Sequence, residues 1–127
     1  IENCVHEDIA FLPWSPLGGG ALSGKYLNGQ RPEGSRWSMS QRNGLFRDSP
    51  QSQQAIQKYV DLAREFSITP SQLALAWCQR VDGVTSTIIG ATTMGQLEEN
   101  INSFELELSP ELQAGIMDIF KQHPLPF

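Results

Sequence analysis

The segment Trp14–Tyr26, WSPLGGGALSGKY, decides how this 127-residue chain is interpreted. It follows a short apolar run, Ile9–Pro13, and contains four glycines and Lys25. The apolar run predicts a buried strand that ends at Ser15 and Pro16, because proline cannot continue a central ladder. Glycines let backbone N–H groups approach an anion closely, and the lysine adds a positive charge. The segment therefore predicts either an anion-binding loop at a strand end or a flexible glycine turn with a solvated lysine.

Two common phosphate-binding motifs do not fit this loop. From Gly19 the letters GGALSGKY follow the G-x-x-x-x-G-K-[ST] pattern until the last position, where Tyr26 stands. A tyrosine cannot supply the small hydroxyl that binds magnesium there, and the following residues do not predict the required helix. A dinucleotide fingerprint fails as well, because Ser23 replaces its third glycine.

A second candidate site follows the run Val84–Ile89, which predicts a strand buried on both faces, as in a parallel sheet. Gly90 and Thr92 come next, and Thr93–Gln96 is a capping box that opens a helix. Free N–H groups, the helix dipole and the two threonine hydroxyls can together hold a phosphate. This strand end therefore predicts a second anion site.

Three polar residues of that helix, Gln96, Glu99 and Asn100, can share one face because they lie three and four positions apart. An amide beside a carboxylate suits the edge of an adenine ring. Taken singly, Gln96 fits a cap bond equally well and Glu99 fits a surface charge. Trp14 likewise suits either the stacking of a ligand ring or an ordinary place in the core.

The order of elements predicts an α/β fold with parallel strands. Residues 18–43 predict a long loop that is either functional or mobile, since they are rich in Gly, Ser, Pro and Arg. Helices are expected to start at Ser49, Thr69 and Ser109, each followed by proline. Two parallel strands alone leave both edges open, so we expect part of a larger sheet or barrel. Their neighbouring tips would bind the two ends of one extended, phosphorylated ligand.

Composition narrows the possible partners. The net charge is −5 and no basic stripe is visible, which argues against nucleic acid. The longest apolar run, Leu73–Cys78, is far short of the ~20 residues that span a bilayer. Cys4 and Cys78 stand apart from any Cys/His cluster, which argues against zinc and for free thiols in a reducing cytoplasm. The first eight residues hold three acids and no basic leader, so no signal peptide is expected.

The segments WSPLGGGALSGKY, GSR at 34–36, TPSQLALAWC at 69–78 and IIGATTMGQLEENI at 88–101 resemble the C-terminal part of an aldo-keto reductase. The likeness is greatest to a Tas-like bacterial group and to the β subunits of voltage-gated potassium channels. It implies a (β/α)8 TIM barrel, of which residues 1–127 would form a partial barrel domain with the last two strands and their helices. It also implies that NADP(H) lies extended across the carboxyl ends of the strands.

The resemblance carries cofactor contacts onto the matching residues. They divide by the part of NADP(H) that they would meet: Trp14 the nicotinamide; Ser15, Pro16, Leu17, Gly18 and Gly19 its ribose and the pyrophosphate; Lys25 and Arg36 phosphate oxygens; Gly90, Thr92 and Gln96 the adenosine ribose with its 2′-phosphate; Glu99 and Asn100 the adenine.

The family's catalytic Asp, Tyr, Lys and His belong to earlier barrel strands, and no tyrosine or histidine of this chain matches them. The resemblance thus implies a cofactor-binding portion without catalytic residues, completed by a missing N-terminal barrel half and acting on a small carbonyl compound. A different class, a cofactor-sensing module that binds a partner as channel β subunits do, is the alternative. A P-loop nucleotidase is a third interpretation, and it predicts magnesium-dependent ATP binding lost on Lys25→Ala.

Overall fold

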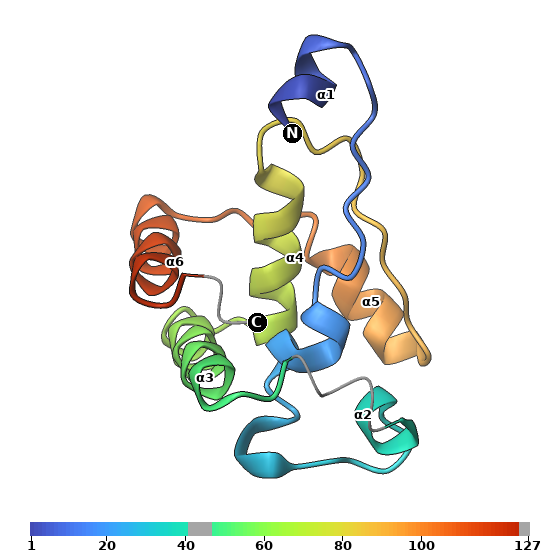
Figure 1. Cartoon of the computed structure of the whole chain (residues 1–127), viewed down its shortest axis with the longest axis vertical. Coiled ribbons are helices and arrows are strands. Elements are labelled where there is room, and N and C mark those ends of the chain that lie inside the picture. Colours follow the sequence, from blue (N-terminus) through green and yellow to red (C-terminus); the bar gives the residue numbers. More distant parts are fainter. Residues whose placement is uncertain (41–46, 125–127) are drawn as a thin grey trace. The chain divides into compact units, whose positions relative to one another are not determined.

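The computed structural model describes residues 1–40 and 47–124 of the chain. Its elements in chain order are α1 (Glu2–His6), the 3₁₀ segments η1 (Gly18–Ser23) and η2 (Leu27–Gly29), α2 (Arg36–Met39), α3 (Pro50–Glu65), α4 (Pro70–Arg80), α5 (Met94–Asn102) and α6 (Pro110–Gln122) (Figure 1). They form two compact units. The first unit comprises Ile1–Pro16 and Ser71–Leu108, and the second comprises Leu17–Pro70 and Ser109–Phe127.

The long helices of the second unit begin where their caps predict. At the start of α3 the Ser49 hydroxyl accepts from the Ser52 N–H at 3.0 Å, and the Ser52 hydroxyl accepts from the Ser49 N–H at 3.3 Å. At the start of α6 the Ser109 hydroxyl accepts from the Leu112 N–H at 3.2 Å. These bonds satisfy donors that the first helical turn leaves unpaired. The predicted helix starts at Ser49 and Ser109 are confirmed, as is that of α4 after Thr69.

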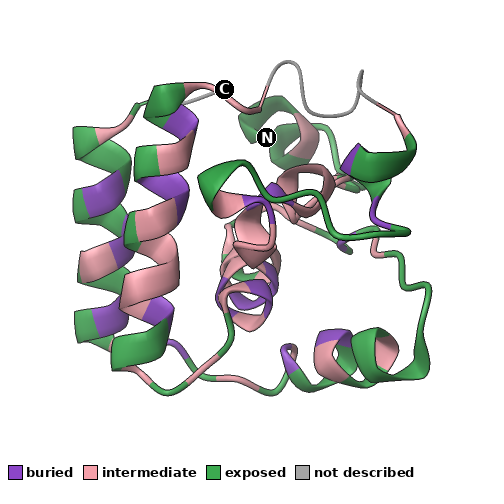
Figure 2. Ribbon diagram, turned by 90° about the horizontal axis from the view of Figure 1, so that it is seen from below, coloured by how far each residue is buried: buried purple, intermediate pink, exposed green. Residues whose placement is uncertain are grey.

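Helix α3 organises the second unit by packing against α6 and against both 3₁₀ segments. Figures 1 and 2 show α3 and α6 side by side. The approach is close at Gly115 of α6, where an added Cβ would stand 2.8 Å from a methyl carbon of Leu62. On α6 the buried residues include Ile119, whereas Phe120 is half exposed. Beyond the α3–α6 pair, Ile56 of α3 joins the buried cluster under the glycine-rich segment.

The first unit brings the two expected strands together but does not make them a sheet. Ile88 N–H donates to the Pro13 carbonyl at 2.9 Å, and Thr85 N–H donates to the Phe11 carbonyl at 2.9 Å. Trp14 and Ile88 form one parallel bridge, and in the described residues no strand is continued from it. The segments therefore run parallel in the expected direction, with a single bridge in place of a ladder.

The prediction of two buried strands is wrong for the described residues. Ile9, Leu12 and Ile88 are about half exposed, and Thr85 and Ser86 are exposed as well. A parallel strand is buried only where helices cover both faces and neighbours satisfy both edges. Within residues 1–40 and 47–124 these two segments pair only with each other, so the conditions for burial are not met.

The predicted long loop is also more ordered than expected. Over residues 18–40 it forms η1, η2 and α2, and residues 41–43 of the predicted loop lie outside the described residues. Helical periodicity did not reveal these turns, because each is shorter than the span over which a period can be seen.

Candidate functional site

The paired segments of the first unit place two predicted site regions at one end. Since the segments run parallel through the Trp14–Ile88 bridge, the residues that follow Trp14 and those that follow Ile88 leave from the same end. The Trp14 side chain is 75% exposed, which excludes the core position for this residue in the chain as described. Ser15 takes a left-handed φ of 60°, an uncommon state for a residue with a side chain. Such strain concentrates at functional turns.

The loop before α5 is held by its own polar side chains. The Thr93 hydroxyl accepts from the Gln96 N–H at 3.2 Å. The Gln96 amide oxygen accepts from both the N–H and the hydroxyl of Thr92, at 2.9 and 3.1 Å. The predicted capping box is thus present in a modified form, in which Gln96 reaches one residue further back than the cap. Thr92 and Gln96 are brought together, and both are exposed.

Further along α5, Asn100 has a positioning role. It is buried, and its amide nitrogen donates to the Gly90 carbonyl at 3.5 Å. Glu99, one residue earlier, is only half buried. The expected common polar face is therefore divided: Asn100 holds the Gly90 loop from inside, while Gln96 stands in solvent.

The glycine-rich turn of the second unit takes a backbone shape that other residues adopt with strain. Gly18, Gly19 and Gly20 have φ values of 58°, 68° and 95°, all in the left-handed region. At the end of η1, Gly24 has a φ of 78°, and an added Cβ would stand 2.8 Å from a Val60 methyl of α3. The turn is therefore packed against α3.

Cationic side chains border this turn. An added Cβ on Gly20 would lie 3.5 Å from Lys25 Nζ, and one on Gly19 would lie 3.9 Å from Arg47 Nη1. Arg36, the first residue of α2, is exposed and follows Ser35, whose hydroxyl caps the helix by accepting from the Ser38 N–H. The lysine that the sequence singled out does lie beside the glycines, and Arg47 joins it.

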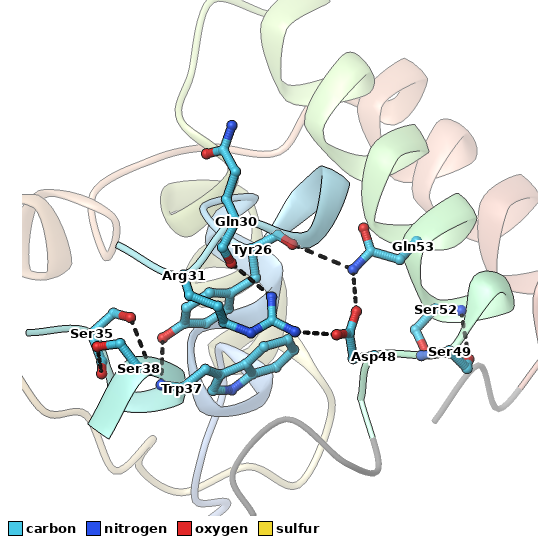
Figure 3. Close-up of polar contacts among 10 residues, drawn as sticks. All are labelled: Tyr26, Gln30, Arg31, Ser35, Trp37, Ser38, Asp48, Ser49, Ser52 and Gln53. Atoms are coloured by element: carbon cyan, nitrogen blue, oxygen red, sulfur yellow. Dashed lines mark hydrogen bonds and ion pairs between the residues drawn. The ribbon is translucent and has the colours of Figure 1, made fainter. Parts of the chain in front are cut away.

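An aromatic stack supports the turn from inside the unit (Figure 3). The rings of Tyr26 and Trp37 are stacked with centroids 4.0 Å apart and planes 5° from parallel, and both residues are almost fully buried. The Arg31 guanidinium lies over both rings, 5.9 Å from the Tyr26 centroid and 5.1 Å from that of Trp37. It also forms an ion pair with Asp48, which accepts in turn from the Gln53 amide at 2.6 Å.

The stack explains why tyrosine stands where a phosphate-binding loop of the Walker type has a small hydroxyl. The Tyr26 ring fills the core, and its hydroxyl accepts from the backbone N–H of Trp37 at 3.4 Å. Tyr26 is thus a structural residue of the turn.

The predicted site residues fall into two groups, one in each unit. The first unit carries Trp14, Ser15, Pro16, Gly90, Thr92, Gln96, Glu99 and Asn100; the second unit carries Leu17, Gly18, Gly19, Lys25 and Arg36. Sequence reasoning missed Trp37 and Arg47. One signal was available for Trp37, a large aromatic residue next to Arg36 in an otherwise polar segment.

The tyrosines and histidines of the chain do not form an acid–base group. Tyr26 is enclosed in the stack, and burial raises the pKa of the Tyr59 hydroxyl above its ordinary value. His6 lies beside Glu7 on an exposed helix, and His123 follows the end of α6. Among the described residues no three metal-binding side chains gather in a cluster. Within the same ranges, no helix combines the length and apolar character needed to cross a membrane.

Comparison with known proteins assigns the chain to a family. The family model of the Aldo/keto reductase family matches residues 1–120, and the chain belongs to that family. It is 42% identical over 125 residues to the protein tas of Escherichia coli, covering 98% of this chain and 36% of that protein.

Two further relatives are named for potassium channels. A probable voltage-gated potassium channel subunit beta of Arabidopsis thaliana is 33% identical over 120 residues, covering 93% of this chain and 36% of that protein. A putative voltage-gated potassium channel subunit beta of Schizosaccharomyces pombe is 38% identical over 118 residues, covering 88% and 34%. The chain therefore spans about a third of the length of the curated relatives it matches.

Proposed function

We propose that this chain is the NADP(H)-binding C-terminal portion of an aldo-keto reductase, which in full length transfers hydride between NADPH and an aldehyde or ketone. The observation that carries the proposal is the parallel bridge between Trp14 and Ile88. The bridge supports the view that the two segments end on the same side. The residues that follow them include the glycines and hydroxyl groups of the expected cofactor site. The family membership supports the same conclusion independently.

The residues of the described chain suit such a cofactor. Exposed Trp14 offers a flat apolar face for the nicotinamide ring. The left-handed glycines leave the backbone open to a phosphate, with Lys25 beside them. Thr92 and Gln96, joined by hydrogen bonds and exposed, are the groups we assign to the adenosine 2′-phosphate. When bound, NADPH supplies the hydride, and these residues orient it.

The rest of a (β/α)8 barrel is the partner that this proposal requires. Ile9, Leu12 and Ile88 expose apolar surface on segments that pair only once in the described chain. The relatives are roughly three times as long as the matched region, since the chain covers 36% of the tas protein. We propose that the remaining strands cover these residues and contribute the general acid that protonates the carbonyl oxygen. The chain on its own is then inactive. The free thiols of Cys4 and Cys78 fit the cytoplasmic location that we propose.

The test is a fluorescence titration of the full-length protein with NADPH, followed by turnover assays on a panel of aldehydes and ketones. We expect saturable NADPH binding and NADPH oxidation dependent on a carbonyl compound. Absence of NADPH binding would contradict the proposal.

A regulatory module is the second candidate, favoured by the two relatives named as channel β subunits. In that case the protein binds NADPH with little or no carbonyl turnover, and cofactor occupancy controls its binding to a partner protein. The same pair of assays separates the two candidates, since only the enzyme oxidises NADPH with a carbonyl compound.

A further inference from the structure

One polar atom in the second unit is buried without a partner. Trp37 is 3% exposed, and its indole nitrogen Nε1 has no hydrogen-bond acceptor among the described residues. A buried donor without an acceptor costs roughly 1–3 kcal/mol, so proteins rarely keep one unless a water, an ion or a ligand uses it. This donor therefore requires an explanation.

The donor lies beside the glycine turn. An added Cβ on Gly19 would stand 3.9 Å from Trp37 Nε1 and the same distance from Arg47 Nη1. An N–H group and a guanidinium thus both lie next to one glycine, whose φ of 68° lies in the left-handed region. Because Gly19 has no side chain, no Cβ occupies the place that both donors border.

The local charge favours an anion. Arg31, the cation that stacks on Trp37, is balanced by its ion pair with Asp48. Lys25 and Arg47, which border the glycines, take part in no ion pair within the described part of the chain. Two cations without an ion pair in the described residues therefore border the turn.

We propose that the Trp37 indole N–H and the Arg47 guanidinium together bind one anionic oxygen of a diphosphate group beside Gly19. The site rests on the proposed function for its natural ligand, the pyrophosphate of NADP(H), and it adds two residues that the family resemblance does not assign. The Tyr26–Trp37 stack fixes the direction of the indole N–H before the ligand arrives. A preorganised donor of this kind binds without the cost of ordering a flexible side chain.

The most direct experiment follows the indole ¹H–¹⁵N resonance of Trp37 in full-length protein labelled at tryptophan. Inorganic pyrophosphate and NADP⁺ are titrated separately, and adenosine 2′-phosphate, which lacks the diphosphate, is the comparison ligand. The Trp37 resonance is identified as the indole signal that disappears in Trp37→Phe. We expect pyrophosphate and NADP⁺ to shift it and adenosine 2′-phosphate to leave it in place.

Affinities measured on variants complete the test. Trp37→Phe keeps an aromatic ring against Tyr26 and removes the N–H, so we expect it to weaken pyrophosphate and NADP⁺ roughly ten-fold while adenosine 2′-phosphate binds unchanged. Trp77→Phe, the same change on α4 of the first unit, is the matched control and should alter none of the three. If Trp37→Phe does not fold, Arg47→Gln replaces it, with the same expectation.

The outcomes separate this inference from the proposed function. If NADP⁺ binds while the Trp37 resonance stays in place and Trp37→Phe or Arg47→Gln binds normally, the inference is overturned and the proposed function stands. If NADP⁺ does not bind but pyrophosphate shifts the resonance, the anion site stands and the proposed function fails. If no ligand moves the Trp37 resonance, the inference is overturned.

Discussion

The two units of this chain differ in how far each stabilises its own candidate site. In the second unit the glycine turn rests on α3 and on the buried Tyr26–Trp37 stack. In the first unit Trp14 and the residues around Gly90 follow segments joined by a single bridge and largely exposed. The comparison teaches that a glycine turn can be held in place by local packing, whereas the ends of parallel strands depend on neighbouring strands.

The prediction with the largest expected effect replaces one isoleucine in each unit by alanine. Ile56→Ala removes a buried side chain of the second unit and should lower the free energy of unfolding by about 2–5 kcal/mol, because it leaves a cavity under the turn. Ile88→Ala, half exposed in this chain, should cost under about 1 kcal/mol here. Urea denaturation of the 127-residue chain measures both.

The same isoleucine pair also tests the proposed barrel. In the full-length protein, where we propose that other strands cover Ile88, its replacement by alanine should become as costly as that of Ile56. If Ile88→Ala changed the free energy of unfolding equally little in the 127-residue chain and in the full-length protein, the proposed covering of the first unit would be contradicted.

The second prediction concerns Arg36 in the second unit. Of the two cations expected at phosphate oxygens, we propose that Arg36 meets the 2′-phosphate and Lys25 the pyrophosphate. We therefore expect Arg36→Ala to weaken NADPH more than NADH, by roughly ten-fold or more, because a charged hydrogen bond to the 2′-phosphate contributes about 1.5–3 kcal/mol. Lys25→Ala is the control, since a pyrophosphate contact affects both cofactors alike. Cofactor dissociation constants from fluorescence give the ratio, and an equal loss for both cofactors in Arg36→Ala would rule out the assignment.

Trp14 gives the corresponding prediction for the first unit. Trp14→Ala should slow hydride transfer in the full-length enzyme by up to about ten-fold, because stacking on the nicotinamide contributes about 0.5–1.5 kcal/mol. Affinity for adenosine 2′-phosphate should stay within two-fold of the unchanged protein, roughly the noise of such a measurement. Trp14→Phe keeps a ring and should recover most of the rate. Stopped-flow measurement of NADPH oxidation is the assay, and a rate unaffected by Trp14→Ala would contradict the stacking role.

The smallest expected effect is the dependence of stability on pH that comes from Tyr59 in the second unit. Burial raises the pKa of Tyr59 on α3 above its ordinary value of 10.0, so the folded state resists ionisation that the unfolded state accepts. Its contribution to stability is complete below that value and is lost as the pH rises through the folded pKa. Denaturation between neutral and strongly alkaline pH should show a flatter decline for Tyr59→Phe than for the unchanged chain. Identical declines would mean that Tyr59 ionises alike in both states.

What could be predicted from the sequence depends on the range of the interactions involved. The starts of α3 and α6 were predictable because Ser49 and Ser109 cap helices through bonds to residues only three positions away. The strands were not, because a ladder and its burial depend on partners elsewhere in a sheet. Ile88 illustrates this, since its β-branched surroundings predicted burial and the described chain leaves it half exposed.

The candidate site shows the same division. The glycines and Lys25 could be recognised because they are contiguous in sequence, and the structure places Lys25 beside Gly20. Trp37 and Arg47 could not be assigned, because they are distant from Gly19 in the sequence and come to lie beside it only in the folded chain. The short helix α1, Glu2–His6, was missed for another reason, since it lacks a side-chain cap and buried residues.

The central claim is that the ends of the two parallel segments in the first unit hold opposite ends of one NADP(H) molecule. A crystal structure of the full-length protein with NADP⁺ tests it most directly. We predict that the nicotinamide ring lies against the Trp14 indole and that the 2′-phosphate accepts hydrogen bonds at Thr92 and Gln96. A bound cofactor that contacts only one of these two places, or neither, would contradict the account.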